Sequence, residues 1–200
     1  MQTVLKKERK ANLSETTSHG GIHLAFALGN KDYGIEIENV RKIIGIINLM
    51  PLPLISRYVN GGDYPDHFPK EVMPKRNSYV KGILQFMGQR MPLIDLRLKL
   101  GLQEAAYTIE TCIIIVKIEH TLKGVIVDKI LDVFDIRGKE IEAVPLFEDD
   151  VNTEVLLGVV TVKDTARILL DIDKVLDTEE INKELKKIKV ATCKSMLLCE

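Results

Sequence analysis

Apolar and polar residues alternate along the first part of the chain, a pattern typical of β-strands with one buried face. In residues 22–28 (IHLAFAL) successive side chains point to opposite faces of the predicted strand. The face with the larger apolar side chains comprises Ile22, Leu24, Phe26 and Leu28. Residues 29–32 (GNKD) form the following turn. Residues 33–47 carry β-branched pairs on either side of Gly45, which predicts two strands and a bend.

Two short apolar runs separated by a turn signal follow a long region without periodicity. Pro51 and Pro53 end the strand pattern, and residues 54–79 mix Pro, Gly, Tyr and charge, which predicts a long insertion-like loop. In the segment KGILQFMGQRMPLIDL, Gly88 suits a turn with positive φ, so the segment predicts a β-hairpin. Pro92 lacks a backbone N–H donor and favours an edge or bulged position in the second strand.

Strand signals continue through the second half of the chain until the period becomes helical. Residues 112–118 (CIIIVKI) are almost continuously apolar, which indicates a strand buried on both faces. The other predicted elements are a helical turn in residues 96–102, a strand followed by a second strand or a bend in residues 123–136, and a hairpin in residues 155–162 and 166–172. From Asp171 onward apolar residues recur every three or four positions, and a C-terminal helix starting near Thr178 is expected.

Nine or ten short strands at roughly ten-residue spacing predict an all-β fold with one terminal helix. No helices intervene between the predicted strands, so closed barrels or a sandwich are favoured over βαβ units. Residues 1–21 carry few apolar side chains and are expected to form a flexible lead. The domain is expected to span residues 22–177, and residues 178–200 to form the C-terminal helix and tail.

Composition and charge narrow the possible function classes. The chain has 200 residues, 46% of them hydrophobic and 28% charged, which is typical of a globular protein with one domain or two small ones. Its net charge of -1 gives no basis for binding nucleic acid or a membrane surface, since both attract concentrated positive charge. The longest apolar run is far shorter than the roughly 20 residues that span a bilayer, so no direct membrane insertion is expected. Three cysteines without C-x-x-C spacing, and an N-terminus without the apolar core of a secretory signal, favour the cytoplasm.

Signals for catalytic and metal sites are weak. Neither G-x-S-x-G nor a Cys–His signature is present, and the Gly-Gly pairs lack the context of a phosphate-binding loop, so neither enzyme activity nor a cofactor is expected. The residues with metal-ligand spacing are His19 with His23, and Asp63 and Asp66 with His67. A flexible tail and a solvated loop explain these positions better than a metal site. Asp128, Asp132 and Asp135 alternate with buried-type residues, which favours the solvent face of a strand over a carboxylate site.

Four segments of the chain occur in an order that resembles one known family. They are LAFALGNKDYGIEIENVRKI, VKGILQFMGQRMPLIDLRLKLG, IIIVKIEHTLKGVIVDKILDVF and LLGVVTVKDTARILLDIDKVL. Together they resemble the CheW-like domain, the coupling adaptor of bacterial chemotaxis arrays, over about residues 22–177. The resemblance implies two packed five-stranded SH3-like barrels and a noncatalytic function. It also implies two partners, the cytoplasmic tip of a methyl-accepting chemoreceptor and the regulatory domain of a CheA-like histidine kinase.

The resemblance also implies which residues contact these partners. The receptor-facing positions are Ile37, Val40, Lys42 and Met87, and the positions of a second contact are Leu131 and Val133, which are equally compatible with a core. Lys42 stands where the family pattern V-x-E-I has its acid, and Met87 stands where N-L-R-G has its arginine. If these two residues lie close together, the paired change favours an altered partner, such as a divergent receptor. Unguided drift at an exposed turn is the alternative.

The segment of residues 57–79 is a further departure, because the family usually keeps this connection short. Its aromatic residues are Tyr58, Tyr64, Phe68 and Tyr79. Packing of the loop onto its own barrel is the favoured interpretation, and an extra contact surface is the alternative. Two other functions stay open. One is a CheW-like scaffold for a different sensory kinase system, and the other is a metal- or ligand-binding protein that uses the insertion.

Overall fold

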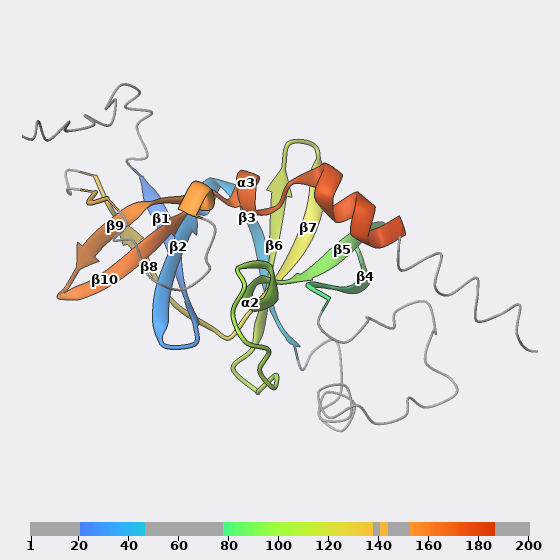
Figure 1. The fold of residues 1–200 in the computed structure, drawn as a ribbon, viewed down its shortest axis with the longest axis horizontal. Coiled ribbons are helices and arrows are strands. Elements are labelled where there is room, and N and C mark those ends of the chain that lie inside the picture. Colours follow the sequence, from blue (N-terminus) through green and yellow to red (C-terminus); the bar gives the residue numbers. More distant parts are fainter. Residues whose placement is uncertain (1–20, 47–77, 138–140, 144–152, 187–200) are drawn as a thin grey trace, which may run out of the picture.

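The computed structural model describes residues 21–46, 78–137, 141–143 and 153–186. These residues form ten strands in two five-stranded sheets, which lie side by side (Figure 1). The expected all-β fold with a C-terminal helix is confirmed. The flexible lead, most of the insertion at residues 57–79 and the C-terminal tail lie outside the described residues, so these expectations stay predictions.

Each sheet curls into a small barrel. The first, called barrel 1, has the strand order β8-β1-β2-β10-β9. Its strands are β1 (Ile22–Leu28), β2 (Lys31–Glu36), β8 (Lys129–Asp135), β9 (Leu156–Val162) and β10 (Thr165–Leu170). The second, called barrel 2, has the order β3-β6-β7-β5-β4. Its strands are β3 (Val40–Gly45), β4 (Val80–Phe86), β5 (Gln89–Asp95), β6 (Cys112–Ile118) and β7 (Thr121–Val127).

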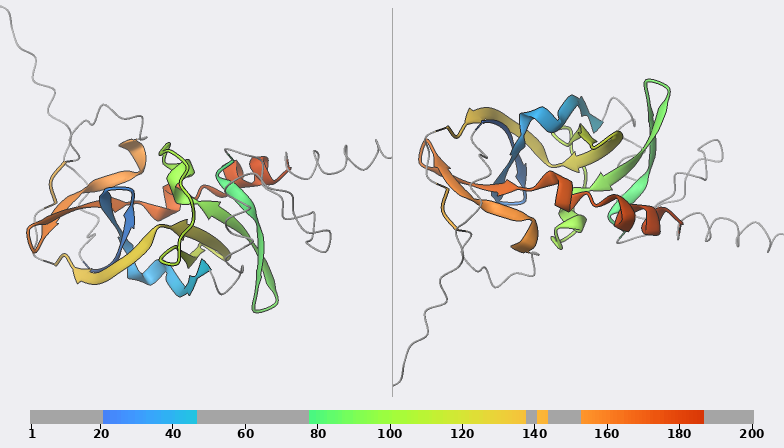
Figure 2. Two further views of the ribbon diagram at one scale, coloured as in Figure 1. Left: turned by 90° about the horizontal axis from the view of Figure 1, so that it is seen from below. Right: turned by 90° about the horizontal axis from the view of Figure 1, so that it is seen from above.

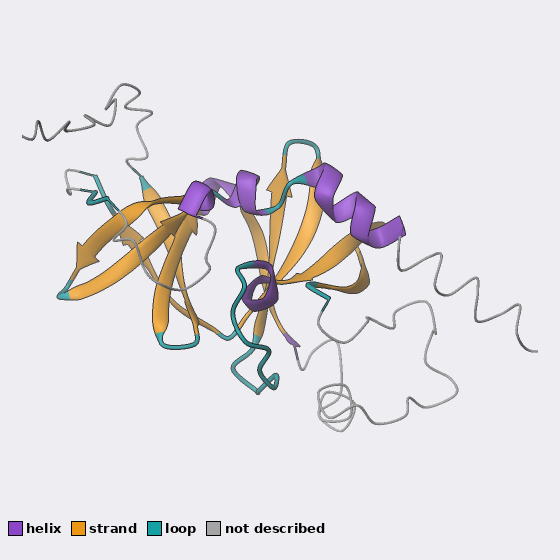
Figure 3. Cartoon of the chain, viewed as in Figure 1, coloured by secondary structure: helices purple, strands orange, loops and turns teal. Residues whose placement is uncertain are grey.

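The chain path is nested, because the chain starts in barrel 1, builds all of barrel 2 and then returns to complete barrel 1. Each barrel contains one parallel pair, β2 with β10 and β5 with β7, and its other pairs are antiparallel. The short helices are η1 (Ile37–Asn39), α2 (Leu96–Lys99), η4 (Thr153–Val155) and α3 (Ile172–Val175). Figure 3 shows α3 and the following C-terminal helix running along one side of both barrels.

Three buried clusters account for the near-continuous apolar strands. Barrel 1 encloses Ala25, Phe134, Ile136, Val160, Val162 and Leu169. Barrel 2 encloses Ile46, Met91, Ile113, Ile115 and Ile126. The largest cluster, called the shared core, joins one face of each barrel; Phe26 and Tyr33 come from barrel 1, and Ile114 and Val125 come from barrel 2. Both faces of each sheet are therefore buried over much of their area. Removing apolar surface from water stabilises the fold by about 25 cal/mol per Å².

Two of the hairpin turns, β4–β5 and β9–β10, each contain two successive residues with positive φ. In the β4–β5 turn, Met87 has φ 48° and Gly88 has φ 77°, the signature of a two-residue type I′ turn. Lys163 and Asp164 form the equivalent turn between β9 and β10, with φ 49° and 64°. Both sequence-predicted hairpins are confirmed, and the β4–β5 hairpin projects from barrel 2 (Figure 2).

The expected edge or bulged position of Pro92 is wrong. Strand β5 lies between β7 and β4, so β4 is the outer strand, and Pro92 pairs regularly with Ile83. The parallel pairing with β7 begins only at Leu93. Pro92 lacks a backbone N–H, and it is tolerated inside the sheet because it lies just before the three residues of β5 that pair with β7.

The C-terminal helical period is divided into two helices. α3 ends at Val175, Leu176 leaves the helical conformation with φ -102° and ψ 42°, and a second helix covers residues 178–186. The expected helix start near Thr178 is confirmed, since the carboxylate of Asp177 accepts a hydrogen bond from the Glu180 N–H at 2.8 Å. This second helix packs on barrel 2, although the chain enters it from barrel 1.

Candidate protein-interaction surfaces

The β4–β5 turn carries the most exposed of the partner-facing residues expected from the sequence. Met87 is 86% exposed and occupies the left-handed region, which costs most non-glycine residues about 1–2 kcal/mol. The ammonium of Lys42 lies 5.3 Å from the centre of the Phe86 ring. Phe86 directly precedes Met87, so Lys42 and the turn are close, as the altered-partner hypothesis requires.

The contact between Lys42 and Phe86 also joins the two outer strands of barrel 2. Lys42 belongs to β3 and Phe86 to β4, which stand at opposite ends of the strand order. A cation over an aromatic face contributes about 0.5–1 kcal/mol at an exposed site. Within the described part of the chain, neither Lys42 nor Arg90 forms an ion pair, so the exposed methionine is accompanied by positive charge.

A second group of exposed apolar residues lies on the outer strand of barrel 1. Val133 is 56% exposed and Leu131 is 37% exposed, and both belong to β8. Val133 pairs with Leu24, a member of the shared core, so its side chain lies on the same face of the sheet. Ile22 of β1 is 45% exposed on that same face. Ile22, Leu131 and Val133 are thus exposed apolar residues on two neighbouring strands of barrel 1.

A pocket of about 310 Å³ opens where β1 begins and β2 ends. Its lining residues are Gly21, Ile22, His23, Glu36, Ile37, Glu38 and Arg137. Ile37 contributes one wall from η1, and it also packs against the shared core, as does Val40. Ile37 and Val40 are half-buried, so they support the surface more than they protrude from it.

The pocket carries charge of both signs. Arg137 donates from Nε to Asp135 at 2.8 Å and from a terminal nitrogen at 2.5 Å, and these hydrogen bonds lower the pKa of Asp135 to about 2. Behind the pocket, the buried His23 ring lies 5.6 Å from the Phe134 ring. The pocket wall thus includes the side chains of Arg137, Glu36 and Glu38, a surface suited to polar groups of a partner.

The three aspartates singled out in the sequence do not share a site. Asp132 and Asp135 are exposed on β8, and Asp128 directly precedes that strand. Each carboxylate pairs with a different arginine, Asp128 with Arg97, Asp132 with Arg167 and Asp135 with Arg137. The preferred interpretation, that these residues mark a solvent face, is confirmed for the two on β8.

The metal-site hypotheses fall mainly on other segments. His19, Asp63, Asp66 and His67 lie outside the described residues, so those hypotheses stay predictions. Among the residues that the structure describes, no three potential metal ligands come together. No helix in the same residues has the length and apolar character needed to cross a membrane.

Sequence reasoning missed three features of these surfaces. The alternating pattern placed Ile22 on the buried face of β1, but Ile22 is 45% exposed. It is the first residue of the strand, and the pattern does not show how far burial extends toward the end of a strand. Sequence reasoning also missed Arg137 in the pocket wall and Phe86 beneath Lys42. Both are brought to their partners by pairing between strands distant in the chain, for which no local signal exists.

Known proteins are similar to this chain in sequence and in fold. The family model of the CheW-like domain matches residues 67–180. The chemotaxis protein CheW of Klebsiella aerogenes is 30% identical over 158 residues, which cover 79% of this chain and 82% of that protein. CheW of Rhizobium meliloti is 25% identical over 170 residues, covering 84% and 96%.

The solved structure of the scaffolding protein TtCheW from Thermoanaerobacter tengcongensis is similar in fold. It has a TM-score of 0.59 and 21% sequence identity, and the match covers 80% of this chain and 94% of that one. The overall fold therefore agrees with that of a known CheW scaffold. With the family model matching more than half of the sequence, the chain belongs to the CheW-like family.

Proposed function

We propose that this protein is a noncatalytic adaptor of bacterial chemotaxis that couples a chemoreceptor to a CheA-type histidine kinase in the cytoplasm. Membership of the CheW-like family is the observation that carries the proposal. The exposed apolar residues support it, because they occur on both barrels and so offer one surface to each partner. Met87 belongs to barrel 2 and Val133 to barrel 1. Interfaces of about 1,200–2,000 Å² in total suit such contacts.

The receptor surface comprises Ile37, Val40, Lys42 and Met87, and its partner is the cytoplasmic tip of a methyl-accepting chemoreceptor. Met87 stands 86% exposed in a strained conformation, and strain of this kind persists mainly where it serves a function. The flexible thioether side chain adapts to an apolar groove on a partner helix. Ile37 and Val40 also pack against the shared core, so they connect this surface to the interior.

The pair Lys42 and Met87 favours an altered receptor. An arginine at position 87 beside Lys42 would oppose two cations, at a cost of up to ~3 kcal/mol at an effective dielectric of 20. Met87 avoids that repulsion, and it also removes the forked donor that would bind a partner carboxylate. A receptor that offers an apolar contact in place of a carboxylate fits this surface. The 5.3 Å contact between Lys42 and Phe86 supports the proximity on which the idea depends.

The kinase surface comprises Leu131 and Val133, and its partner is the regulatory domain of a CheA-like kinase. Both residues are on an outer strand whose apolar side chains reach solvent. A scaffold for a different sensory kinase system is the second candidate, and the Lys42 and Met87 changes are the observation that favours it.

Binding of the purified full chain to a receptor-tip fragment and to a CheA regulatory domain tests the proposal. We expect the receptor fragment to co-sediment with the kinase domain only when the chain is present. Val133→Asp places a charge in the kinase surface and should weaken kinase binding by about 2 kcal/mol, roughly thirtyfold, with receptor binding retained. No bridging by the wild-type chain, with partners from its own gene neighbourhood, would contradict the proposed function.

The double variant Lys42→Glu, Met87→Arg tests the altered receptor. It restores the acid of V-x-E-I and the arginine of N-L-R-G, and it should weaken binding to the chain's own receptor tip. Lys163→Glu reverses a charge in the other type I′ turn, on barrel 1, and serves as the matched control. An unchanged receptor affinity in the double variant would leave drift as the explanation of Lys42 and Met87.

A further inference from the structure

The chain returns from barrel 2 to barrel 1 through a single residue. β7 ends at Val127 and β8 begins at Lys129, so Asp128 is the entire connection. The shared core holds the barrels together, and apolar burial is itself a non-directional force. Hydrogen bonds between the barrels add contacts with a preferred direction, which help to fix the angle between them.

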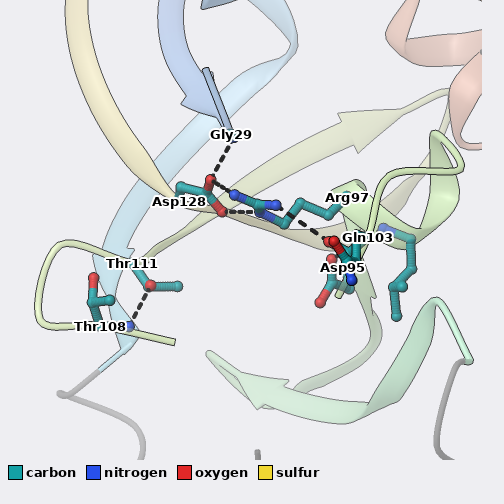
Figure 4. A network of polar contacts seen from close by, with 8 residues as sticks. Gly29, Asp95, Arg97, Gln103, Thr108, Thr111 and Asp128 are labelled. Atoms are coloured by element: carbon teal, nitrogen blue, oxygen red, sulfur yellow. Dashed lines mark hydrogen bonds and ion pairs between the residues drawn. The ribbon is translucent and has the colours of Figure 1, made fainter. Parts of the chain in front are cut away.

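The Asp128 carboxylate bonds to both barrels at once (Figure 4). Its Oδ1 accepts a hydrogen bond from Arg97 Nε at 2.6 Å, and its Oδ2 accepts one from a terminal nitrogen of Arg97 at 2.5 Å. Arg97 lies in α2, directly after β5 of barrel 2. The same Oδ2 accepts the Gly29 N–H at 2.7 Å, from the β1–β2 turn of barrel 1.

The backbone of Asp128 adds a further bond to barrel 1. Its N–H donates to the Ala27 carbonyl at 3.2 Å. Gly29 has φ 64°, and this conformation turns its N–H toward the carboxylate without a steric cost. The crossover residue is therefore tied to β1 and to the β1–β2 turn before β8 begins.

Arg97 is itself held in place on barrel 2. Its remaining terminal nitrogen donates to the Gln103 carbonyl at 3.2 Å. The helix that carries it is capped by Asp95, which accepts from the Leu98 N–H at 3.3 Å and from the Tyr107 hydroxyl at 2.9 Å. The Arg97 side chain is largely buried. Its guanidinium forms two parallel hydrogen bonds with the Asp128 carboxylate, an arrangement called the fork, and such a pair fixes orientation more tightly than a single hydrogen bond does.

We infer that the Arg97–Asp128 pair, with the Gly29 N–H, sets the angle between the two barrels and thereby the relative placement of the two partner surfaces. Arg97 and Asp128 are positioning residues, because they touch neither surface. The consequence for coupling rests on the proposed function, whereas the consequence for barrel orientation does not. Loss of the fork should leave each surface intact and change how the two act together.

A matched pair within one barrel provides the control. Arg167 donates to both carboxylate oxygens of Asp132, at 2.7 and 3.0 Å, and joins β10 to β8 inside barrel 1; it uses its two terminal nitrogens, whereas Arg97 uses Nε and one terminal nitrogen. Arg97→Lys and Arg167→Lys are the same chemical change, since lysine keeps the charge and loses the fork. Only the first change acts between barrels. Asp128→Asn provides a second variant at the junction.

Residual dipolar couplings of the full-length chain measure the orientation. We expect one alignment tensor to fit both barrels in the wild type and in Arg167→Lys, at the same relative orientation. In Arg97→Lys and Asp128→Asn, we expect each barrel to fit well alone and the two tensors to disagree. If both junction variants retain the wild-type orientation, the inference is wrong, whether or not either partner binds.

Binding measurements test the consequence for coupling. Each binary affinity of Arg97→Lys should stay within about twofold of wild type, while bridging of receptor fragment and kinase domain falls at least about fivefold. A changed orientation with unchanged bridging would overturn the link between angle and coupling. A wild-type chain that binds neither partner would remove the proposed function and leave the orientation result to decide the role of the pair.

Discussion

Gly34 leaves the space that the Phe134 ring occupies inside barrel 1. It lies in β2, opposite Ala25 of β1 and Leu169 of β10. A Cβ added at Gly34 would lie 2.7 Å from Cζ of Phe134 and 3.3 Å from a methyl carbon of Leu169. The ring has little freedom to move away, because the Arg167 guanidinium lies 4.5 Å from its centre. Gly34→Ala should therefore destabilise the protein.

The magnitude follows from two opposing terms. Overpacking of a buried site costs about 1–3 kcal/mol, and the ring held by Arg167 places this site in the upper part of that range. Replacing glycine by alanine reduces the entropy of the unfolded chain and returns about 0.4–1 kcal/mol. We expect a net loss of about 1–2 kcal/mol. Phe134→Leu should cost about 1–2 kcal/mol alone, because it loses buried area and the contact with Arg167.

Urea unfolding of the wild type, both single variants and the double variant measures the coupling. The double variant should be at least about 1 kcal/mol more stable than the sum of the single changes implies, since leucine vacates the space that the new methyl group needs. Gly21→Ala is the control, because nothing lies within 4 Å of a Cβ at that position. A neutral Gly34→Ala, or strict additivity in the double variant, would refute the packing argument.

Three further substitutions test other parts of the structure. Lys123 is 2% exposed and donates to the Leu176 carbonyl at 2.6 Å, and burial lowers its pKa. Between that lowered pKa and the ordinary 10.5, the unfolded chain binds the proton more than the folded protein does, so wild-type stability should rise with pH over this range. Lys123→Met should lose this slope in denaturation series and speed hydrogen exchange in residues 178–186. Burial raises the pKa of Asp95 above 3.8, so the wild-type stability should fall as pH rises from 3.8 to the pKa of the folded protein. In Asp95→Asn, the urea midpoint of unfolding should no longer show this fall with pH. Met87→Asn should stabilise the β4–β5 turn by about 1 kcal/mol in urea unfolding and weaken receptor-tip binding, because Asn-Gly suits a type I′ turn.

Local elements were predictable because short-range geometry determines them. Gly88 indicated a positive-φ turn between two apolar runs, and that hairpin forms as expected. The continuous apolar run in residues 112–118 indicated burial on both faces, and β6 is buried on both, between the shared core and the interior of barrel 2. In each case the deciding neighbours lie within a few positions along the chain.

Long-range pairing was not predictable from the pattern. β2 pairs in parallel with β10, which lies more than a hundred positions later, and nothing local marks either strand for the other. Lys123 illustrates the same limit, because a lysine at a strand position suggests a solvent-facing side chain. It is buried because the segment at Leu176 and Thr178 returns to supply two acceptors for its ammonium.

The residues of the candidate surfaces were predicted from the family resemblance and not from residue type. Lys42 and Met87 were singled out because they depart from V-x-E-I and N-L-R-G. Their proximity depends on the curling of barrel 2, which brings β3 to β4 at Phe86. Ile37 lines a pocket whose other walls come from β1 and Arg137, which is again a product of the nested chain path.

The nested path makes the two proposed partner surfaces parts of one folded unit. Leu131 and Val133 lie on β8, which follows all of barrel 2 in the sequence, and Asp128, the residue just before that strand, is bonded to Arg97 of barrel 2. β8 then pairs with β1 from the other end of the sequence. The position of Leu131 and Val133 on barrel 1 therefore depends in part on the contact between Asp128 and barrel 2. A scaffold that presents the two proposed partners at a constant angle gains from this arrangement, because a contact with barrel 2 fixes the point at which the chain enters β8.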